Sequence, residues 1–389
     1  MKTRNYVKYF AWLLTPLLIF ACSGEQLGEA GDSSPTDEDA IVEAVDVSYD
    51  DTRALNLDLS SFSLSVYNQK TKVFLADKIL FTKAISGSGF TGAKTWRMAN
   101  AEMKAIAVSP SMDDLSAIVV DADNHYFEYE VPDVPEGTMY KIGANLSFTK
   151  ASAGNKLSLK FVNALALLTV RVRNELKLED KDGNEFDVKV YVKGITIHNL
   201  YSKGRFTFTS ATNGKWTAID GYYSNYSQDL ATAVELSATT YTDVANGAFV
   251  LLPQAPDQRA WTGTGSISDA DANHQVYIEL RCSMTAERNG NTVYIWGGAN
   301  SYPSVYLPYV KKYCPKSWNT INKQGVYNLR FIKSEVLDTD GKPIEPQTEE
   351  EGDSFENAVF IEVAPTDTSD DDNVDDWEDM NLAPYDVTI

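Results

Sequence analysis

Histidine and cysteine are scarce in this sequence, with three of each in 389 residues. His125, His198 and His274 are scattered, and none has the spacing to a serine, a cysteine or a second histidine that a hydrolase or a zinc site needs. No glycine-rich phosphate loop occurs either. We therefore predict that the protein is not an enzyme and needs no cofactor. We interpret His198, which ends Ile195-Thr196-Ile197-His198, as a half-exposed strand residue.

The apolar run at residues 10–21 is too short to span a bilayer, because it has 12 residues and a span takes about 20. It follows a basic segment that contains Lys2, Arg4 and Lys8, and it stops at Cys22. This pattern is typical of a cleavable secretory signal, here residues 1–22, with a lipobox ending in Ile19-Phe20-Ala21-Cys22. We predict lipidation of Cys22 and a membrane anchor in the bacterial envelope. The alternative is an ordinary signal in which Cys22 is incidental.

Basic residues are almost missing from the C-terminal tail. Residues 335–389 hold 19 acidic residues and one base, Lys342, and so carry most of the net charge of −21. Such a tail is repelled by phosphate backbones, which argues against nucleic-acid partners. Asp338 to Gly341 and Asp370 to Asp376 resemble parts of calcium loops, but neither has the full ligand spacing. We interpret both stretches as solvated linkers and predict no metal site.

Helical periodicity is nearly absent, whereas alternation of apolar and polar residues is common. Clusters of Gly, Asn, Asp and Pro separate the alternating segments and are typical of turns. Many short strands divided in this way predict an all-β protein built from β-sandwiches. Charged residues 174–185 predict a hinge near residue 180, and residues 23–40 predict a flexible tether. The clearest alternating segments are 62–66, 157–161, 168–173, 188–192, 206–208 and 276–282.

Six sequence segments occur in a characteristic order and spacing. They are Trp96 with 104–110, 159–166, 249–254, 305–308, Trp318 with 325–329, and 377–379. This order resembles that of the fimbrillins, the subunits of type V pili, and the resemblance covers nearly the whole exported chain. One departure is Asn163, which stands where a histidine usually precedes the Ala-Leu of the central strand. A structural role tolerates that exchange better than a catalytic one would.

The resemblance implies two transthyretin-like β-sandwich domains in tandem, at residues 54–178 and 179–389. It implies export as an outer-membrane lipoprotein, proteolysis at the cell surface that removes residues up to 53, and a fimbrium formed with other pilus subunits by donor-strand exchange. The resemblance also implies that the fimbrium supports adhesion to a ligand on a host or bacterial surface.

Arg53 is the predicted processing residue, because it is the only Arg or Lys between Lys8 and Lys70. Cleavage would make Ala54 the new N-terminus and release a short strand containing Val45. That strand is predicted from the alternation of Val45, Val47 and Tyr49. Its loss would open a groove with unpaired backbone groups that favours capture of another strand. The alternative is a surface arginine in a linker.

The predicted donor strand is the C-terminal segment in which Tyr385, Val387 and Ile389 alternate with polar residues. A second strand-like segment is Ala358 to Val363. The alternative is that both segments pair within their own domain. A different function would then follow, namely a monomeric, lipid-anchored surface protein that binds a glycan or a host protein on aromatic loops. The aromatic candidates are Tyr222, Tyr223, Tyr226, Trp261, Tyr294, Trp296, Tyr302, Tyr306 and Tyr309.

Cys282 and Cys314 leave two readings open. Export permits a disulfide between them. Cys282 also continues the apolar series Val276, Ile278 and Leu280, which fits a buried free thiol equally well.

Overall fold

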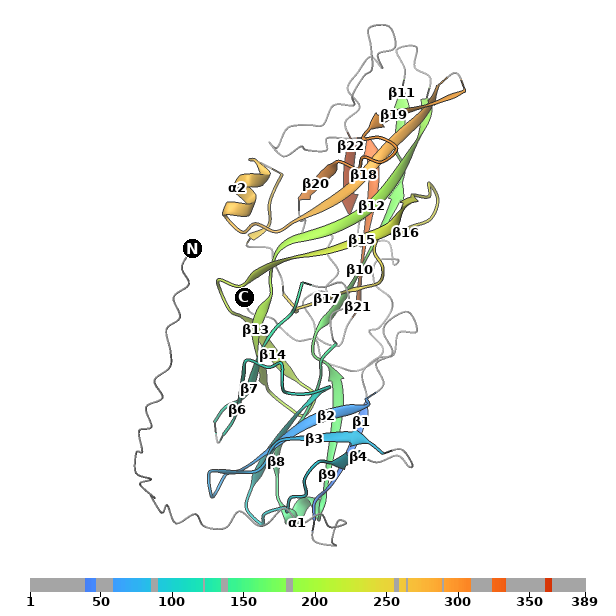
Figure 1. Ribbon diagram of the computed structural model, residues 1–389. Helices are drawn as coiled ribbons and strands as arrows, with labels where there is room; N and C mark the ends of the chain where they lie inside the picture. Colours follow the sequence, from blue (N-terminus) through green and yellow to red (C-terminus); the bar gives the residue numbers. More distant parts are fainter. Residues whose placement is uncertain are drawn as a thin grey trace, which may run out of the picture. The chain divides into compact units, whose positions relative to one another are not determined.

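Strands form most of the described part of this protein, with two short helices between them (Figure 1). The predicted all-β class is therefore confirmed. Neither helix has the length and apolar character that crossing a membrane would take, within the part of the chain described here. The computed structural model describes residues 39–46, 59–84, 90–121, 123–133, 139–179, 185–254, 259–263, 265–288, 290–308, 324–333 and 361–365.

A seven-stranded sheet holds the N-terminal strands. Alternation along β9 shows why it forms, because Leu157, Leu159 and Phe161 are buried and the residues between them are exposed. Its neighbours are antiparallel except β1 and β9, which are parallel. The strands in spatial order are β1 (Ile41–Asp46), β9 (Lys156–Asn163), β8 (Lys141–Phe148), β5 (Met103–Ser109), β2 (Ser61–Asn68), β3 (Val73–Lys83) and β4 (Phe90–Gly92).

A four-stranded sheet pairs residues from either side of the predicted boundary at 178/179. Its inner strands, β13 and β7, are antiparallel, and Phe206 lies opposite Phe127. The Phe127 ring also meets the Trp216 ring edge-on, with 5.5 Å between centroids. The division into two tandem domains stays a prediction. The strands in order are β14 (Gly214–Ala218), β13 (Lys203–Phe208), β7 (His125–Glu130) and β6 (Ala117–Val120).

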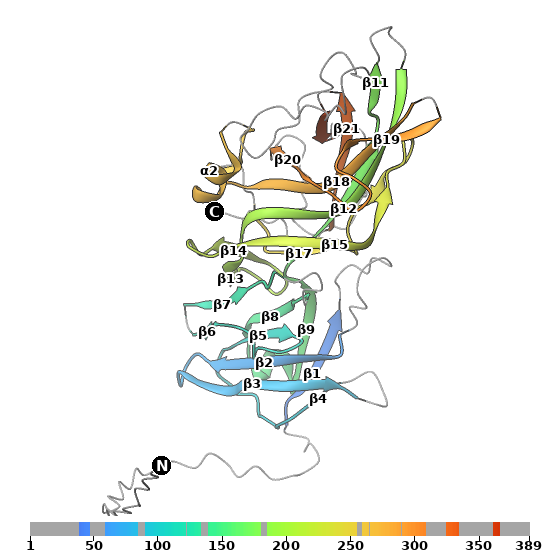
Figure 2. The ribbon, with the colours of Figure 1, turned by 45° about the horizontal axis from the view of Figure 1, so that its top comes forward.

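Two long strands of the six-stranded sheet, β12 and β18, run antiparallel side by side (Figures 1 and 2). A β-bulge interrupts β12 near Gly194, where an added Cβ would clash with the side chains of Arg281 and Asp229. The sheet comprises β11 (Lys177–Glu179), β12 (Glu185–Tyr201), β18 (Tyr277–Arg288) and β19 (Asn291–Trp296), with β15 (Tyr223–Glu235) on β12 and β20 (Ser304–Pro308) on β18.

The five-stranded sheet joins the middle of the sequence to its C-terminal part. Its central strands, β10 and β21, are parallel, and Thr169 lies opposite Val326. The outer strand, β22, is antiparallel to β21. The strands are β16 (Thr242–Asp243), β10 (Ala166–Asn174), β21 (Gln324–Lys333) and β22 (Ile361–Pro365), with β17 (Phe249–Leu251) also on β10.

Side-chain caps begin both helices. In α1 (Lys150–Ala153), Thr149 and Ser152 form a reciprocal capping box. In α2 (Ile267–Ala272), the Ser266 hydroxyl accepts a hydrogen bond from the backbone N–H of Asp269. Each helix thus satisfies backbone donors that its first turn leaves open.

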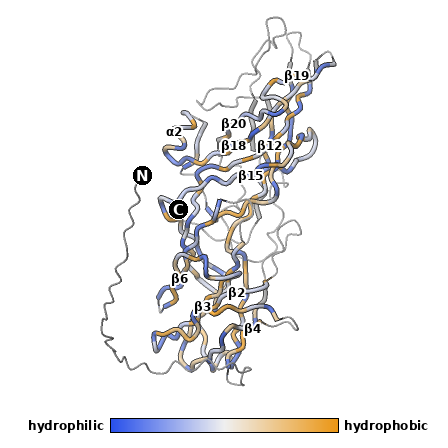
Figure 3. The backbone as a smooth tube through the Cα atoms, in the orientation of Figure 1, coloured by the Kyte–Doolittle hydropathy of each residue, from blue (hydrophilic) through white to orange (hydrophobic). Residues whose placement is uncertain are grey.

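Two large hydrophobic clusters form the cores. One lies in the seven-stranded sheet and includes Phe62, Leu157 and Phe161. The larger one extends from Tyr67 to Phe331 and draws on all four sheets. Figure 3 shows hydrophobic and hydrophilic stretches alternating at short intervals along the chain, as strands with one buried face require.

Candidate functional site

The outermost strand of the seven-stranded sheet, β1, forms its ladder of backbone pairs with β9 alone, among the residues that the structure describes. It pairs with residues 156–161 of β9 in parallel, so that Val42 lies opposite Leu157 and Ala44 opposite Leu159. The backbone N–H of Ala40 donates to the carbonyl of Trp96 at 2.9 Å, and that of Ile41 donates to the carbonyl of Asn155 at 2.7 Å. We call residues 156–161 of β9, which β1 covers, the β1 edge.

Small side chains fix β1 to the core. Val42 is 3 % exposed and packs in the same cluster as Leu157, Leu159 and Phe161. Ala40 and Ala44, two residues to either side, are partly buried against that cluster. Ile41 points the other way and is 44 % exposed. The sheet therefore holds β1 by a short row of small apolar contacts.

Two ion pairs add to these contacts. The Lys156 Nζ atom on β9 lies 2.8 Å from Glu43 Oε1 on β1. The Arg97 Nε atom lies 3.4 Å from Asp39 Oδ1. Asp39 lies two residues before the start of β1. The Glu43 and Lys156 side chains are about half exposed, so that pair lies in water-accessible surroundings. In both pairs the acid belongs to the N-terminal segment and the base to the rest of the fold.

The strand begins earlier than the sequence pattern indicated. The alternation of Val45, Val47 and Tyr49 predicted a strand at 45–49, whereas β1 is Ile41–Asp46. Alternation of the small residues Ala40, Val42 and Ala44 is the signal that marks the buried face, and it is weak because alanine is found at many exposed positions too. Residues 47–58 lie outside the described part of the chain.

The predicted processing, lipidation and donor residues also lie outside the described ranges. This applies to Cys22, Arg53 and Ala54, and to Tyr385, Val387 and Ile389. The structure therefore places the strand that would be removed, and the edge it covers, while the sites that would act on them stay predictions.

Part of the other strand-like C-terminal segment is paired within its own chain. Ile361–Pro365 forms β22, in which Val363 lies opposite Phe331 of β21 and Pro365 opposite Leu329. This is the intramolecular pairing that the alternative interpretation of the C-terminus expected for Ala358 to Val363.

The aromatic candidates for a ligand-binding face are divided between core and surface. Trp261 and Tyr226 are 0 % and 2 % exposed, so they serve the core. Tyr222 and Tyr294 are each 40 % exposed, but they lie on different parts of the six-stranded sheet, beside the start of β15 and on β19. The remaining described members, Tyr223, Trp296, Tyr302 and Tyr306, are half-buried.

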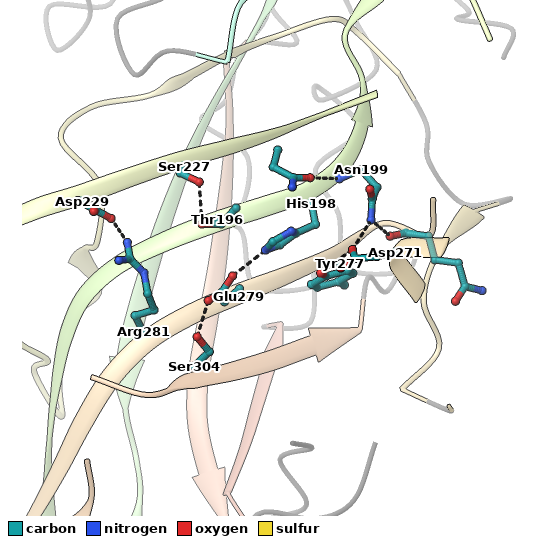
Figure 4. A network of polar contacts seen from close by, with 12 residues as sticks. Thr196, His198, Asn199, Ser227, Asp229, Asp271, Tyr277, Glu279, Arg281 and Ser304 are labelled. Carbon is teal, nitrogen blue, oxygen red and sulfur yellow. Dashed lines mark hydrogen bonds and ion pairs between the residues drawn. The ribbon is translucent and has the colours of Figure 1, made fainter. Parts of the chain in front are cut away.

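A polar network links β12, β18 and β20 (Figure 4). The His198 Nε2 atom lies 2.7 Å from Glu279 Oε2, and the Ser304 hydroxyl donates to the other oxygen of the same carboxylate. The His198 ring also stacks on the Tyr277 ring at 4.3 Å. Burial by itself raises the pKa of the Glu279 carboxyl, but the hydrogen bonds from His198 and Ser304 outweigh it and leave that pKa below its usual value.

The network continues to α2 through Asn199. A φ of 59° places Asn199 in the left-handed region, which asparagine tolerates, next to an irregularity in the β12–β15 pairing. Its side-chain amide donates to Asp271 and to the carbonyl of Gln275, both at 3.0 Å. The Tyr277 hydroxyl donates to the same Asp271 oxygen at 2.8 Å. Asp271 thus accepts hydrogen bonds from both Asn199 and Tyr277.

Ser304, His198 and Glu279 do not form a serine–histidine–acid triad. In such a triad the histidine lies between the serine and the acid, whereas here Glu279 lies between Ser304 and His198. His198 lies in a strand, as predicted, but its side chain is 13 % exposed and is therefore more buried than the half-exposed position that the sequence indicated. No cluster of metal-ligating side chains occurs among the residues that the structure describes.

Cys282 is a free thiol in the core. It lies on β18, is 0 % exposed and is in the larger hydrophobic cluster. Burial raises the pKa of this thiol. Of the two readings of this cysteine, the structure supports the buried free thiol; Cys314 lies outside the described residues.

Solved structures that are similar to this chain include fimbrial and cell adhesion proteins from Bacteroides and Parabacteroides species. A fimbrial protein from Bacteroides vulgatus aligns with a TM-score of 0.52 at 12 % identity, over 85 % of this chain and 99 % of that chain. A candidate cell adhesion protein from Parabacteroides distasonis aligns with a TM-score of 0.43 at 10 % identity, over 84 % and 99 %. Only the first similarity is strong enough to carry an argument, and at this identity it establishes the fold alone.

No protein-family model and no curated protein matches the sequence. The β-sandwich fold that the fimbrillin resemblance implied is nevertheless confirmed by the structural alignment.

Proposed function

We propose that this chain is a structural subunit of a cell-surface pilus. It is exported as an outer-membrane lipoprotein through Cys22, cut after Arg53, and joined to other pilus subunits by donor-strand exchange in support of adhesion. The observation that carries the proposal is the β1 edge, where a short strand is bound to one neighbour and is followed, seven residues after Asp46, by Arg53.

The chemistry of this edge suits exchange. Loss of β1 exposes the backbone N–H and C=O groups of β9 together with the apolar surface around Leu157 and Leu159. An edge of this kind binds another strand through main-chain hydrogen bonds and alternate side-chain contacts. Such joining needs no cofactor. The shared fold with a fimbrial protein from Bacteroides vulgatus supports the same proposal.

A second candidate function is a monomeric, lipid-anchored surface protein that binds a glycan or a host protein. One observation favours it, because β22 pairs with β21 of the same chain, as a C-terminus docked on its own domain would. The two candidates differ in the fate of residues 22–53, which the second would retain.

The test is to purify the protein from the cell surface, measure its intact mass and N-terminal sequence, and run it on detergent gels without boiling. The pilus proposal expects a start at Ala54 and SDS-resistant ladders. Arg53→Ala should retain the acylated Cys22 start and remove the ladder. Lys70→Ala, which changes the next basic residue along the chain, is the matched control and should behave as the parent protein.

A single monomeric species that begins at acylated Cys22 would overturn the pilus proposal. It would leave the lipid-anchored binding protein as the better assignment.

A further inference from the structure

We infer that the β1 edge is an electrostatic docking site for the acidic C-terminal segment of a second copy of this chain, with Lys156 and Arg97 as the receiving bases. The acidic N-terminal segment occupies the same edge before cleavage. This inference rests on the proposed function and adds to it the force that brings donor and acceptor together.

Charge is divided along the chain into three parts. Residues 23–53 contain ten acidic residues and one base, and residues 335–389 contain 19 acidic residues and one base. Residues 54–334 between them contain 29 bases and 26 acids, a net charge of +3. The segment that leaves and the segment that would arrive are therefore both strongly acidic, whereas the body that receives them is slightly basic.

Two ion pairs at the β1 edge show the same division between an acidic N-terminal segment and a basic body. Glu43 lies on Lys156 at 2.8 Å, and Asp39 lies on Arg97 at 3.4 Å. Both acids precede Arg53 and both bases follow it, so cleavage takes one carboxylate away from beside each base. Lys160, an exposed residue of β9, lies opposite Val45 farther along the same edge. After cleavage, Lys156, Lys160 and Arg97 would lie along the edge that β1 has left.

The C-terminal segment has the pattern that β1 has. Val42-Glu43-Ala44 places one acid between two residues directed at the core, of which Val42 is fully buried. Tyr385-Asp386-Val387 likewise places one acid between two apolar residues. A strand bound with Tyr385 and Val387 inward would direct Asp386 outward, beside the position that Glu43 occupies on Lys156.

Attraction between the acidic segment and the basic edge raises the rate at which two chains meet. Opposite charges raise association rates. At physiological ionic strength, salt screens this attraction at distances beyond about 8 Å. Main-chain hydrogen bonds and apolar contacts then hold the joined strand. We therefore expect assembly to be slowed by salt, and finished polymers to resist it.

The experiment cuts the full chain with an arginine-specific protease and follows polymer growth by light scattering. From about 20 to about 200 mM NaCl, we expect the rate to fall at least about five-fold. Lys156→Glu and Asp386→Lys should each slow growth at low salt by a similar factor. The combined Lys156→Glu/Asp386→Lys chain should recover much of the rate, because the opposite pair is restored.

Lys70→Glu is the matched control, since it reverses an exposed lysine outside the β1 edge and should leave the rate unchanged. Thermal unfolding of each variant before cutting verifies that it is folded. Growth that is independent of salt and equal for Lys156→Glu and Lys70→Glu would overturn this inference and leave the pilus proposal standing. A cut chain that forms no polymer at any salt concentration would instead overturn the pilus proposal, and this inference with it.

Discussion

Glu43 on β1 and Lys156 on β9 form an ion pair across the outermost junction of the seven-stranded sheet, with 2.8 Å between Oε1 and Nζ. They are 113 residues apart in the sequence. Arg53 lies between them, so a single cut after Arg53 separates the acid from the base. The pair thus joins the segment that would leave to the body that would stay.

Val42→Ala should loosen β1. Val42 is 3 % exposed, and the change removes two buried methyl groups, which we expect to lower the free energy of unfolding by about 1–2 kcal/mol. Denaturant unfolding of the uncut chain measures the change. Ile41→Ala is the control, because Ile41 is 44 % exposed and its truncation should have little effect. Equal losses for the two variants would contradict the assignment of Val42 as the buried contact of β1.

Gly143→Ala should destabilise the fold beside the β1 edge. A Cβ at Gly143 would lie 2.7 Å from the backbone carbonyl oxygen of Lys160, which cannot turn aside as a side chain does. We expect β9 to shift and the free energy of unfolding to fall by about 1–3 kcal/mol. Gly298→Ala is the control, since the nearest atom there is Ser301 Cβ at an ordinary 3.7 Å. Chemical denaturation compares the two; a Gly143→Ala variant as stable as the parent would refute the close approach.

Glu279→Gln should make the free energy of unfolding less dependent on pH. The folded state lowers the pKa of Glu279 from its usual 4.5, so the stabilisation it contributes is present above pH 4.5 and is lost as pH falls through the lower folded value. The variant lacks this component, and its unfolding free energy should fall less between pH 5 and pH 3. At pH 7 we expect it to be less stable by about 1–3 kcal/mol, because His198 and Ser304 lose a charged acceptor.

Glu287→Gln is the control for that experiment. Glu287 lies on the same strand, with its side chain 69 % exposed and 3.7 Å from Lys189. Exposed pairs contribute little, so this change should alter stability by less than about 1 kcal/mol. Parallel pH profiles for Glu279→Gln and the parent chain would show that the Glu279 network does not respond to pH.

Cys282 should be inert in the folded protein. It is fully buried, and burial raises the pKa of its thiol, so a thiol reagent at pH 8 should modify it only after unfolding. The measurement uses a chain that carries both Cys22→Ser and Cys314→Ser, so that Cys282 is the single remaining thiol. Reaction of the native protein at the rate of a free peptide would contradict its burial. Cys282→Ser should cost about 1–3 kcal/mol, more than Cys282→Ala, because serine buries a hydroxyl.

Alternation in the sequence was sufficient to predict β9, β12 and β18, because each buries one face and exposes the other over several residues. The same pattern identified Cys282 as a member of an apolar series and placed His198 in a strand, although His198 is more buried than the half-exposed position that was predicted. It placed the start of β1 about four residues too late, because alanines that face the core there cannot be told from alanines at the surface by composition.

The long-range pairings could not be predicted from these patterns. β13 pairs with β7 from the other side of the expected domain boundary, although nothing in Lys203–Phe208 distinguishes His125–Glu130 from other alternating strands. Partner choice among many similar strands depends on register, side-chain fit and the order in which loops close.

The amino-acid sequence by itself determined the all-β class, the concentration of acid in the two terminal segments and the position of an isolated arginine between a short strand and the first sandwich. Only the tertiary structure decided that this strand runs parallel to β9 and buries Val42, and that Lys156 and Arg97 pair with Glu43 in the strand and with Asp39 just before it. Composition and periodicity describe residues that are close in the sequence. The ion pair between Glu43 and Lys156 joins residues 113 positions apart, so it forms only after the sheet has brought their strands together.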